Sequence, residues 1–151
     1  MDEATVCEVQ QWLHKADHDL RAAARLTETG EDEPLLDTAV YYCQQAVEKA
    51  LEAYLTAHGI VFSKIHLLAP LLEQCKDKEK EFSRFDDAAD FLTPFATEFR
   101  YPGETMDPDP ADVTEAYAVA AEIVSFVVAR LSEIDKGQPE GNDMEFRAGK
   151  E

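Results

Sequence analysis

The sequence predicts an all-α protein, folded as an up-down bundle of about five helices. Apolar residues recur at spacings of three and four over long stretches, which is the period of one helix face. Glycine and proline are scarce, and they lie mainly between these stretches, where they separate one helix from the next. No segment shows the alternation of a half-buried strand, and no internal repeat is present. Short connections between successive helices favour a bundle.

The first two predicted helices cover residues 5–29 and 35–58. The first has a single apolar stripe and ends before Gly30, a residue that accommodates a left-handed cap. The second ends before Gly59 and has a broader apolar stripe, so we expect it to be a central helix with neighbours on two sides. That stripe consists of Ala39, Val40, Cys43, Ala46, Val47, Ala50, Leu51, Tyr54 and Leu55.

A third, shorter helix is predicted over residues 64–76, with Ser63 as its N-cap. A polar linker follows, and a fourth helix is predicted over residues 82–99. Pro94 lies inside this fourth helix, where it removes a hydrogen bond and clashes with the preceding turn. We expect a kink there, or a restart with Thr93 as cap and Pro94 at the first helical position. The apolar face of the third helix consists of Ile65, Leu68, Leu72 and Cys75.

The last helix is predicted over residues 110–134, after a proline-rich loop. Asp109 is its expected N-cap, and Asp112 places a negative charge in the first turn. The helical bundle therefore covers residues 1–135. Residues 136–151 are polar and aperiodic, and we expect them to be a disordered tail.

Composition restricts the cellular location and the partners. The net charge of −18 opposes non-specific binding to DNA and to anionic membranes. It fits a protein partner, or an acidic surface that only keeps the chain in solution. Three widely spaced cysteines without a CxxC pair are typical of a reducing cytosol. Neither a secretory signal nor an apolar run of about 18 residues is found, so we expect a cytoplasmic protein without a membrane span.

Four segments carry a family pattern, in the same order and at fitting separations. Residues 12–20 read WLHKADHDL and residues 42–51 read YCQQAVEKAL. Residues 64–68 read KIHLL, and residues 99–103 read FRYPG before the last helix. With these segments the chain resembles the HEPN family over about residues 5–133.

The resemblance implies a small helical bundle that pairs as a homodimer. Many members form a complex with a minimal nucleotidyltransferase, and nucleotide binding has been proposed for that branch. Another branch consists of metal-independent ribonucleases, which use an arginine followed four to six residues later by a histidine. Arg100 matches the arginine, but no histidine follows it in residues 101–107 or anywhere after His66. That chemistry needs an imidazole to move a proton near neutral pH, so its absence argues against ribonuclease activity.

We therefore expect a dimeric HEPN-type binding module that acts with a nucleotidyltransferase partner, in a toxin–antitoxin or nucleotide-binding role. The alternative is a metal-independent ribonuclease that binds RNA and uses an atypical proton carrier, for example Glu104 or Asp107. Neither interpretation requires a cofactor.

Arg100 is the candidate catalytic or phosphate-binding residue of this site. Its planar guanidinium group would bind phosphate. The alternative is a structural arginine that pairs with Glu98 or Glu104, or that caps helix carbonyl groups. Tyr101 belongs to the same candidate cleft, although its position before Pro102 also suits a residue that shapes the turn.

Three further candidate cleft residues come from the middle of the chain. His66, in the first turn of the third predicted helix, would contact a phosphate or a base, or serve as a structural hydrogen-bonding histidine. Gln45 and Lys49 are four residues apart on one side of the second helix. With Gln44 and Glu48 they line the cleft or form a solvated face, and a solvated face is the commoner outcome.

Two other features have structural explanations. His14 and His18 have a spacing that suits a metal, but two histidines are too few for a closed site, so no metal is predicted. Cys43 falls within an apolar stripe and is expected to be a core residue.

Overall fold

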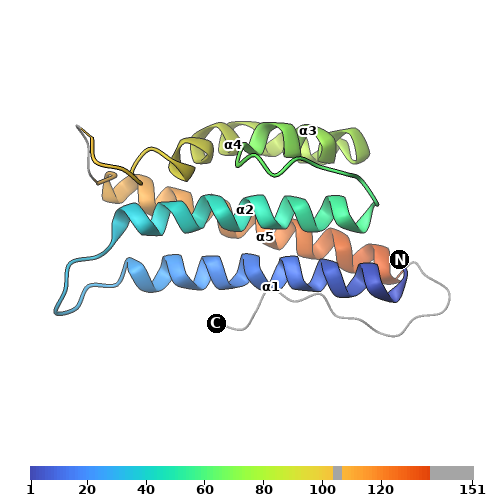
Figure 1. Cartoon of the computed structure of the whole chain (residues 1–151), viewed down its shortest axis with the longest axis horizontal. Helices are drawn as coiled ribbons and strands as arrows, with labels where there is room; N and C mark the ends of the chain where they lie inside the picture. The colour runs from blue at the N-terminus through green and yellow to red at the C-terminus, as the bar shows by residue number, and fades with distance from the viewer. Residues whose placement is uncertain (104–106, 137–151) are drawn as a thin grey trace.

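The computed structural model describes residues 1–103 and 107–136, and it confirms an all-α bundle (Figure 1). Five α-helices are present in this part of the chain, together with a short 3-10 helix on each side of α4. The predicted tail lies outside the described residues, except for its first residue, which ends the last helix. The elements are α1 (Glu3–Leu26), α2 (Leu36–Ala57), α3 (Leu68–Lys78), η1 (Lys80–Phe85), α4 (Asp86–Leu92), η2 (Thr93–Ala96) and α5 (Pro110–Lys136).

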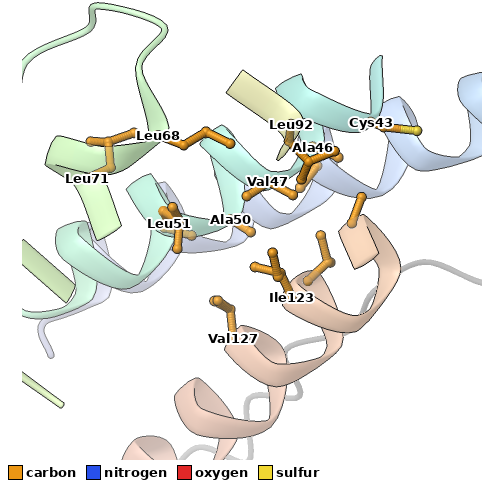
Figure 2. Packing of buried hydrophobic residues seen from close by; sticks show 14 of the residues in the cluster. Cys43, Ala46, Val47, Ala50, Leu51, Leu68, Leu71, Leu92, Ile123 and Val127 are labelled. Atoms are coloured by element: carbon orange, nitrogen blue, oxygen red, sulfur yellow. The ribbon is translucent and has the colours of Figure 1, made fainter. Parts of the chain in front are cut away.

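Helix α2 is the centre of the bundle. It packs along α1 on one side and against α5, α3, α4 and η2 on the others (Figure 1). Small residues such as Ala46 and Ala50, both fully buried, let the neighbouring helices approach closely. Figure 2 shows side chains of α2 between those of α3 and α5. The core residues labelled there include Val47, Ala50 and Leu51 of α2, Leu68 and Leu71 of α3, and Ile123 and Val127 of α5.

Aromatic rings fix the short helices around α4 to the core. The ring of Phe82 lies 4.6 Å from that of Tyr54 on α2 and 5.1 Å from that of Phe126 on α5. Phe85 also meets Phe126 edge to face at 5.1 Å. Phe82 and Phe85 are both buried.

The end of α2 follows the prediction for Gly59. This glycine has a φ of 67°, in the left-handed region that favours glycine. The amide of Ile60 donates to the carbonyl of Leu55 at 2.9 Å, and the amide of Gly59 donates to that of Thr56 at 3.1 Å. This pair of bonds is a Schellman motif, and it turns the chain back along α2.

The predicted third helix begins four residues too early. The observed helix α3 starts at Leu68. Its N-cap is Leu67, in extended geometry, and not Ser63. The cause is Pro70, which would fall in the second turn of a helix that starts at residue 64 and would break its hydrogen bonding there. In the observed helix Pro70 falls in the first turn, where no N–H is needed. Ile65 therefore lies outside the helix and is half exposed.

The predicted fourth helix over residues 82–99 is not one α-helix, because its first residues belong to η1 and the chain breaks again at its proline. Helix α4 ends at Leu92, and η2 begins at Thr93 with Pro94 in its first turn. The restart is confirmed, but Thr93 does not cap it, because its hydroxyl group donates to the carbonyl of Ala89 at 2.7 Å.

The last helix starts as predicted. The side chain of Asp109 accepts a hydrogen bond from the amide of Ala111 at 2.9 Å, which satisfies one of the free N–H groups of the first turn. No helix in the described residues is both long enough and apolar enough to cross a membrane.

We predict that Gly59→Ala lowers the free energy of unfolding by about 1 kcal/mol, because alanine is strained at this φ. A Cβ at residue 59 meets no atom within 4 Å, so a steric clash does not contribute. Gly30→Ala is the matched control, since that site is also open and its φ is not positive. Urea unfolding of both variants measures the difference, and equal losses would contradict the assignment.

Candidate functional site

A row of polar side chains lies along one face of α2. Gln45, Glu48 and Glu52 follow one another at spacings of three and four, and all are buried, as is the neighbouring Gln44. The expectation that Gln44, Gln45 and Glu48 belong to a solvated face is wrong. The reason is the returning segment 60–67, which runs back along α2 and contacts this row (Figure 1).

Glu48 is the centre of the row. Its side chain is only 4% exposed, and its two carboxylate oxygens lie 3.0 and 3.1 Å from Nδ1 of His66. One of them also accepts a hydrogen bond from Nε2 of Gln45 at 2.9 Å. Gln45 in turn donates to the side-chain oxygen of Gln44 at 2.7 Å. A buried carboxylate is stable only with such partners, so these bonds fix the local geometry.

His66 is held in an unusual conformation. Its φ is 55°, which costs a non-glycine residue on the order of 1 kcal/mol. The bond to Glu48 and the contact between Nε2 of Gln44 and the His66 carbonyl, 3.4 Å apart, hold it there. The imidazole is 63% exposed. One of its nitrogens is therefore fixed by a carboxylate while the ring still faces solvent, an arrangement suited to proton transfer or to contact with an anion.

Glu52 extends the buried row and is the less satisfied of the two glutamates. Its Oε2 has no hydrogen-bond partner in the described part of the chain. Burial, and then the negative charge of Glu48, raise the pKa of Glu52 to about 7. A carboxyl group with this pKa changes charge near neutral pH.

Arg100 lies over another residue of the same α2 face. Its guanidinium carbon is 4.0 Å from the ring centroid of Tyr41, a cation–π contact between an exposed arginine and a half-buried ring. Tyr41 precedes Glu48 by seven residues, two helical turns or about 10 Å along the axis. Within residues 1–103 and 107–136 Arg100 forms no ion pair, so it does not pair with Glu98 there, and Glu104 lies outside these residues.

The remaining cleft candidates lie apart from this row. Lys49 is directed toward α1, where its Nζ lies 2.6 Å from a carboxylate oxygen of Asp19. Burial raises the pKa of Asp19 even though this lysine lowers it. Tyr101 is 74% exposed beyond the end of η2. Of the five candidates, His66 and Gln45 are brought together through Glu48, and Arg100 joins the same face of α2.

The His14–His18 pair and Cys43 do not belong to this row. The rings of His14 and His18 lie 4.1 Å apart on the exposed side of α1. Across the described residues no group of three or more His, Cys, Asp or Glu side chains is placed to hold a metal ion. Cys43 is fully buried, and burial raises the pKa of its thiol to about 12, so it is a core residue as predicted.

The chain matches the model of a known family over most of its length. The model of the HEPN domain matches residues 9–133, which is most of the chain. The chain belongs to the HEPN family. Comparison with curated proteins and with solved structures gave no match. The HEPN match includes the buried row on α2, His66 and Arg100.

Sequence reasoning missed two members of this candidate site, Tyr41 and Glu52. Both lie on the face of α2 that carries Gln45 and Glu48, at helical spacings from them. That spacing was the available signal for both residues. What it could not provide was the covering segment, because a solvated helix face and a covered polar face have the same periodicity.

We predict that the protein loses stability as the pH rises from about 4.5 to about 7. In this window the native state keeps the proton on Glu52, whose pKa is raised, while the unfolded chain releases it. Glu52→Gln should reduce this pH dependence and add about 3 kcal/mol of stability at alkaline pH. Urea unfolding across pH measures the effect. The exposed Glu115→Gln is the control, and an unchanged profile in Glu52→Gln would contradict the assignment.

Proposed function

We propose that this HEPN protein is a dimeric binding module that acts with a nucleotidyltransferase partner, in a toxin–antitoxin or nucleotide-binding role. The observation that carries the proposal is the pairing of two exposed groups on one face of α2. These are the Arg100 guanidinium over Tyr41 and the His66 imidazole bound to Glu48.

The chemistry of these two groups favours binding over catalysis. Arg100 has no carboxylate partner among the described residues, so its guanidinium group is available to bind a phosphate. His66 and Arg100 contact residues of α2 that are two helical turns apart, about 10 Å along the axis, so the two groups approach a ligand at different points along the helix. The two groups are therefore better placed to hold two ends of a ligand.

Exposed apolar side chains beside the site support a dimer. Val61, Ile65 and Leu67 are 90%, 49% and 47% exposed, and all belong to the segment that carries His66. Exposed apolar residues gathered in one segment are typical of a protein interface. We propose that a second copy covers them, which places the two His66 residues on either side of a shared cleft with Arg100 at its edge.

The charge of the chain supports a protein partner of complementary charge. A net charge of −18 attracts a protein with a basic surface and repels free nucleic acid. In the proposed complex the nucleotidyltransferase supplies the nucleotide chemistry, and this chain supplies the interface. If a nucleotidyltransferase gene lies beside this one, co-expression and co-purification of the two products would test the partnership. Separate elution of the two proteins would contradict it.

We predict that Leu67→Asp converts the dimer into a monomer, because it places a charge in the proposed apolar interface. Light scattering coupled to size-exclusion chromatography measures the mass. Leu35→Asp is the matched control, since Leu35 is 53% exposed but lies at the far end of α2. A monomeric wild-type protein, or a dimer that survives Leu67→Asp, would contradict the interface.

The ribonuclease alternative is favoured by one observation, the bond between His66 and Glu48. It provides an oriented imidazole in a chain whose arginine motif lacks its histidine. We predict no cleavage of RNA by the wild-type protein above the level of an Arg100→Ala variant. Cleavage that disappears in both Arg100→Ala and His66→Ala would establish the alternative and contradict a purely binding role.

A further inference from the structure

All four lysine and arginine residues that precede Lys64 in the sequence line one open groove between α1 and α2. The groove has a volume of about 570 Å³, within the range of small-molecule sites. This concentration of cations contrasts with the net charge of −18. The four residues are Lys15, Arg21 and Arg25 of α1 and Lys49 of α2.

Much of this positive charge is not neutralised within the groove. In the described chain, Lys15 and Arg25 form no hydrogen bond or ion pair through their side chains, and both are exposed. Arg21 lies 3.8 Å from Asp17, beyond ordinary hydrogen-bond distance. Only Lys49 has a close partner, the buried Asp19. The groove therefore presents an excess of cations to solvent.

The ends of the groove limit the size of an anionic ligand. Beyond Arg25 the surface becomes acidic, with Glu28, Glu31, Asp32 and Glu33 lining the adjoining depression. Beyond Lys15 lies Glu8. The α1 cations span ten residues, about 15 Å along the helix axis. A long polyanion would run into these carboxylates, whereas a short one fits between them.

The chemistry of the lining favours phosphate. Two arginines one helical turn apart present planar forks that bind phosphate oxygens in pairs. Tyr42 also lines the groove and is partly exposed, so its ring is available to a base. Neither Arg100 nor His66 lines this groove.

We propose that the groove between α1 and α2 binds a short compound with several consecutive phosphate groups. Either free polyphosphate or a nucleoside triphosphate carries this chemistry. The site is separate from the face of α2 that meets His66 and Arg100, and the proposal does not depend on the function proposed above.

Isothermal calorimetry of the full chain with sodium tripolyphosphate and with ATP, both without divalent cations, tests the proposal. We expect at least one of the two probes to bind. Arg21→Ala/Arg25→Ala should weaken that binding by about tenfold or more, because two charged forks are lost. Both arginines are exposed on a helix that alanine favours, so circular dichroism should show an unchanged fold. Arg21→Lys/Arg25→Lys keeps the two charges but not the planar guanidinium groups. Its affinity should therefore lie between that of the wild-type protein and that of the double alanine variant.

Lys78→Ala/Lys80→Ala is the matched control, because it removes two exposed cations far from the groove and should leave binding unchanged. Equal affinity for both probes would identify phosphate alone as the ligand. Tighter binding of ATP that is lost in Tyr42→Leu would identify a nucleotide.

Four results would overturn the proposal. One is the absence of heat with both probes. Another is a loss of affinity in Lys78→Ala/Lys80→Ala or in Arg100→Ala that equals the loss in Arg21→Ala/Arg25→Ala. The others are equal binding of an oligoglutamate peptide and tighter binding of a long single-stranded RNA than of either short probe.

Discussion

One constraint organises this structure: the carboxylate of Glu48 lies inside a helical bundle and must find partners there. A buried charge without partners costs several kcal/mol, more than a single domain can easily tolerate. Gln45 of the same helix supplies one hydrogen bond, and His66 supplies the contact from outside α2. That contact draws segment 60–67 against α2 and holds His66 in its left-handed conformation. The same interaction thus buries the polar row and leaves an imidazole exposed beside it.

The distribution of charge separates structural cations from available ones. On one side of the bundle Arg130 of α5 forms ion pairs with Glu79, Glu81 and Glu133, which tie α5 to the start of η1. Exposed pairs of this kind contribute little stability each, but they consume the positive charge of that region. On α1 and at Arg100 the cations have few or no such partners. In a chain this acidic, these are the surfaces that attract anions.

Periodicity was enough to predict the bundle, and the width of the apolar stripe was enough to predict the central position of α2. Residue type was enough to predict the caps at Gly59 and Asp109, because a cap depends on local chemistry. It failed at the third helix, where Pro70 shifts the start to Leu68. It also failed for the polar face of α2, because burial there depends on segment 60–67, whose His66 is 18 residues away from Glu48 in sequence. Arg100 and His66 were selected by resemblance, and their separation along α2 required the three-dimensional structure.

A double-mutant cycle on Glu48 and His66 tests the central interaction most directly. Urea unfolding of the wild-type protein, Glu48→Ala, His66→Ala and the double variant gives the coupling energy between the two side chains, free of their separate packing effects. The bond described above predicts a favourable coupling of about 1–2 kcal/mol. A coupling of zero would mean that segment 60–67 is held on α2 by other contacts, and it would contradict the account.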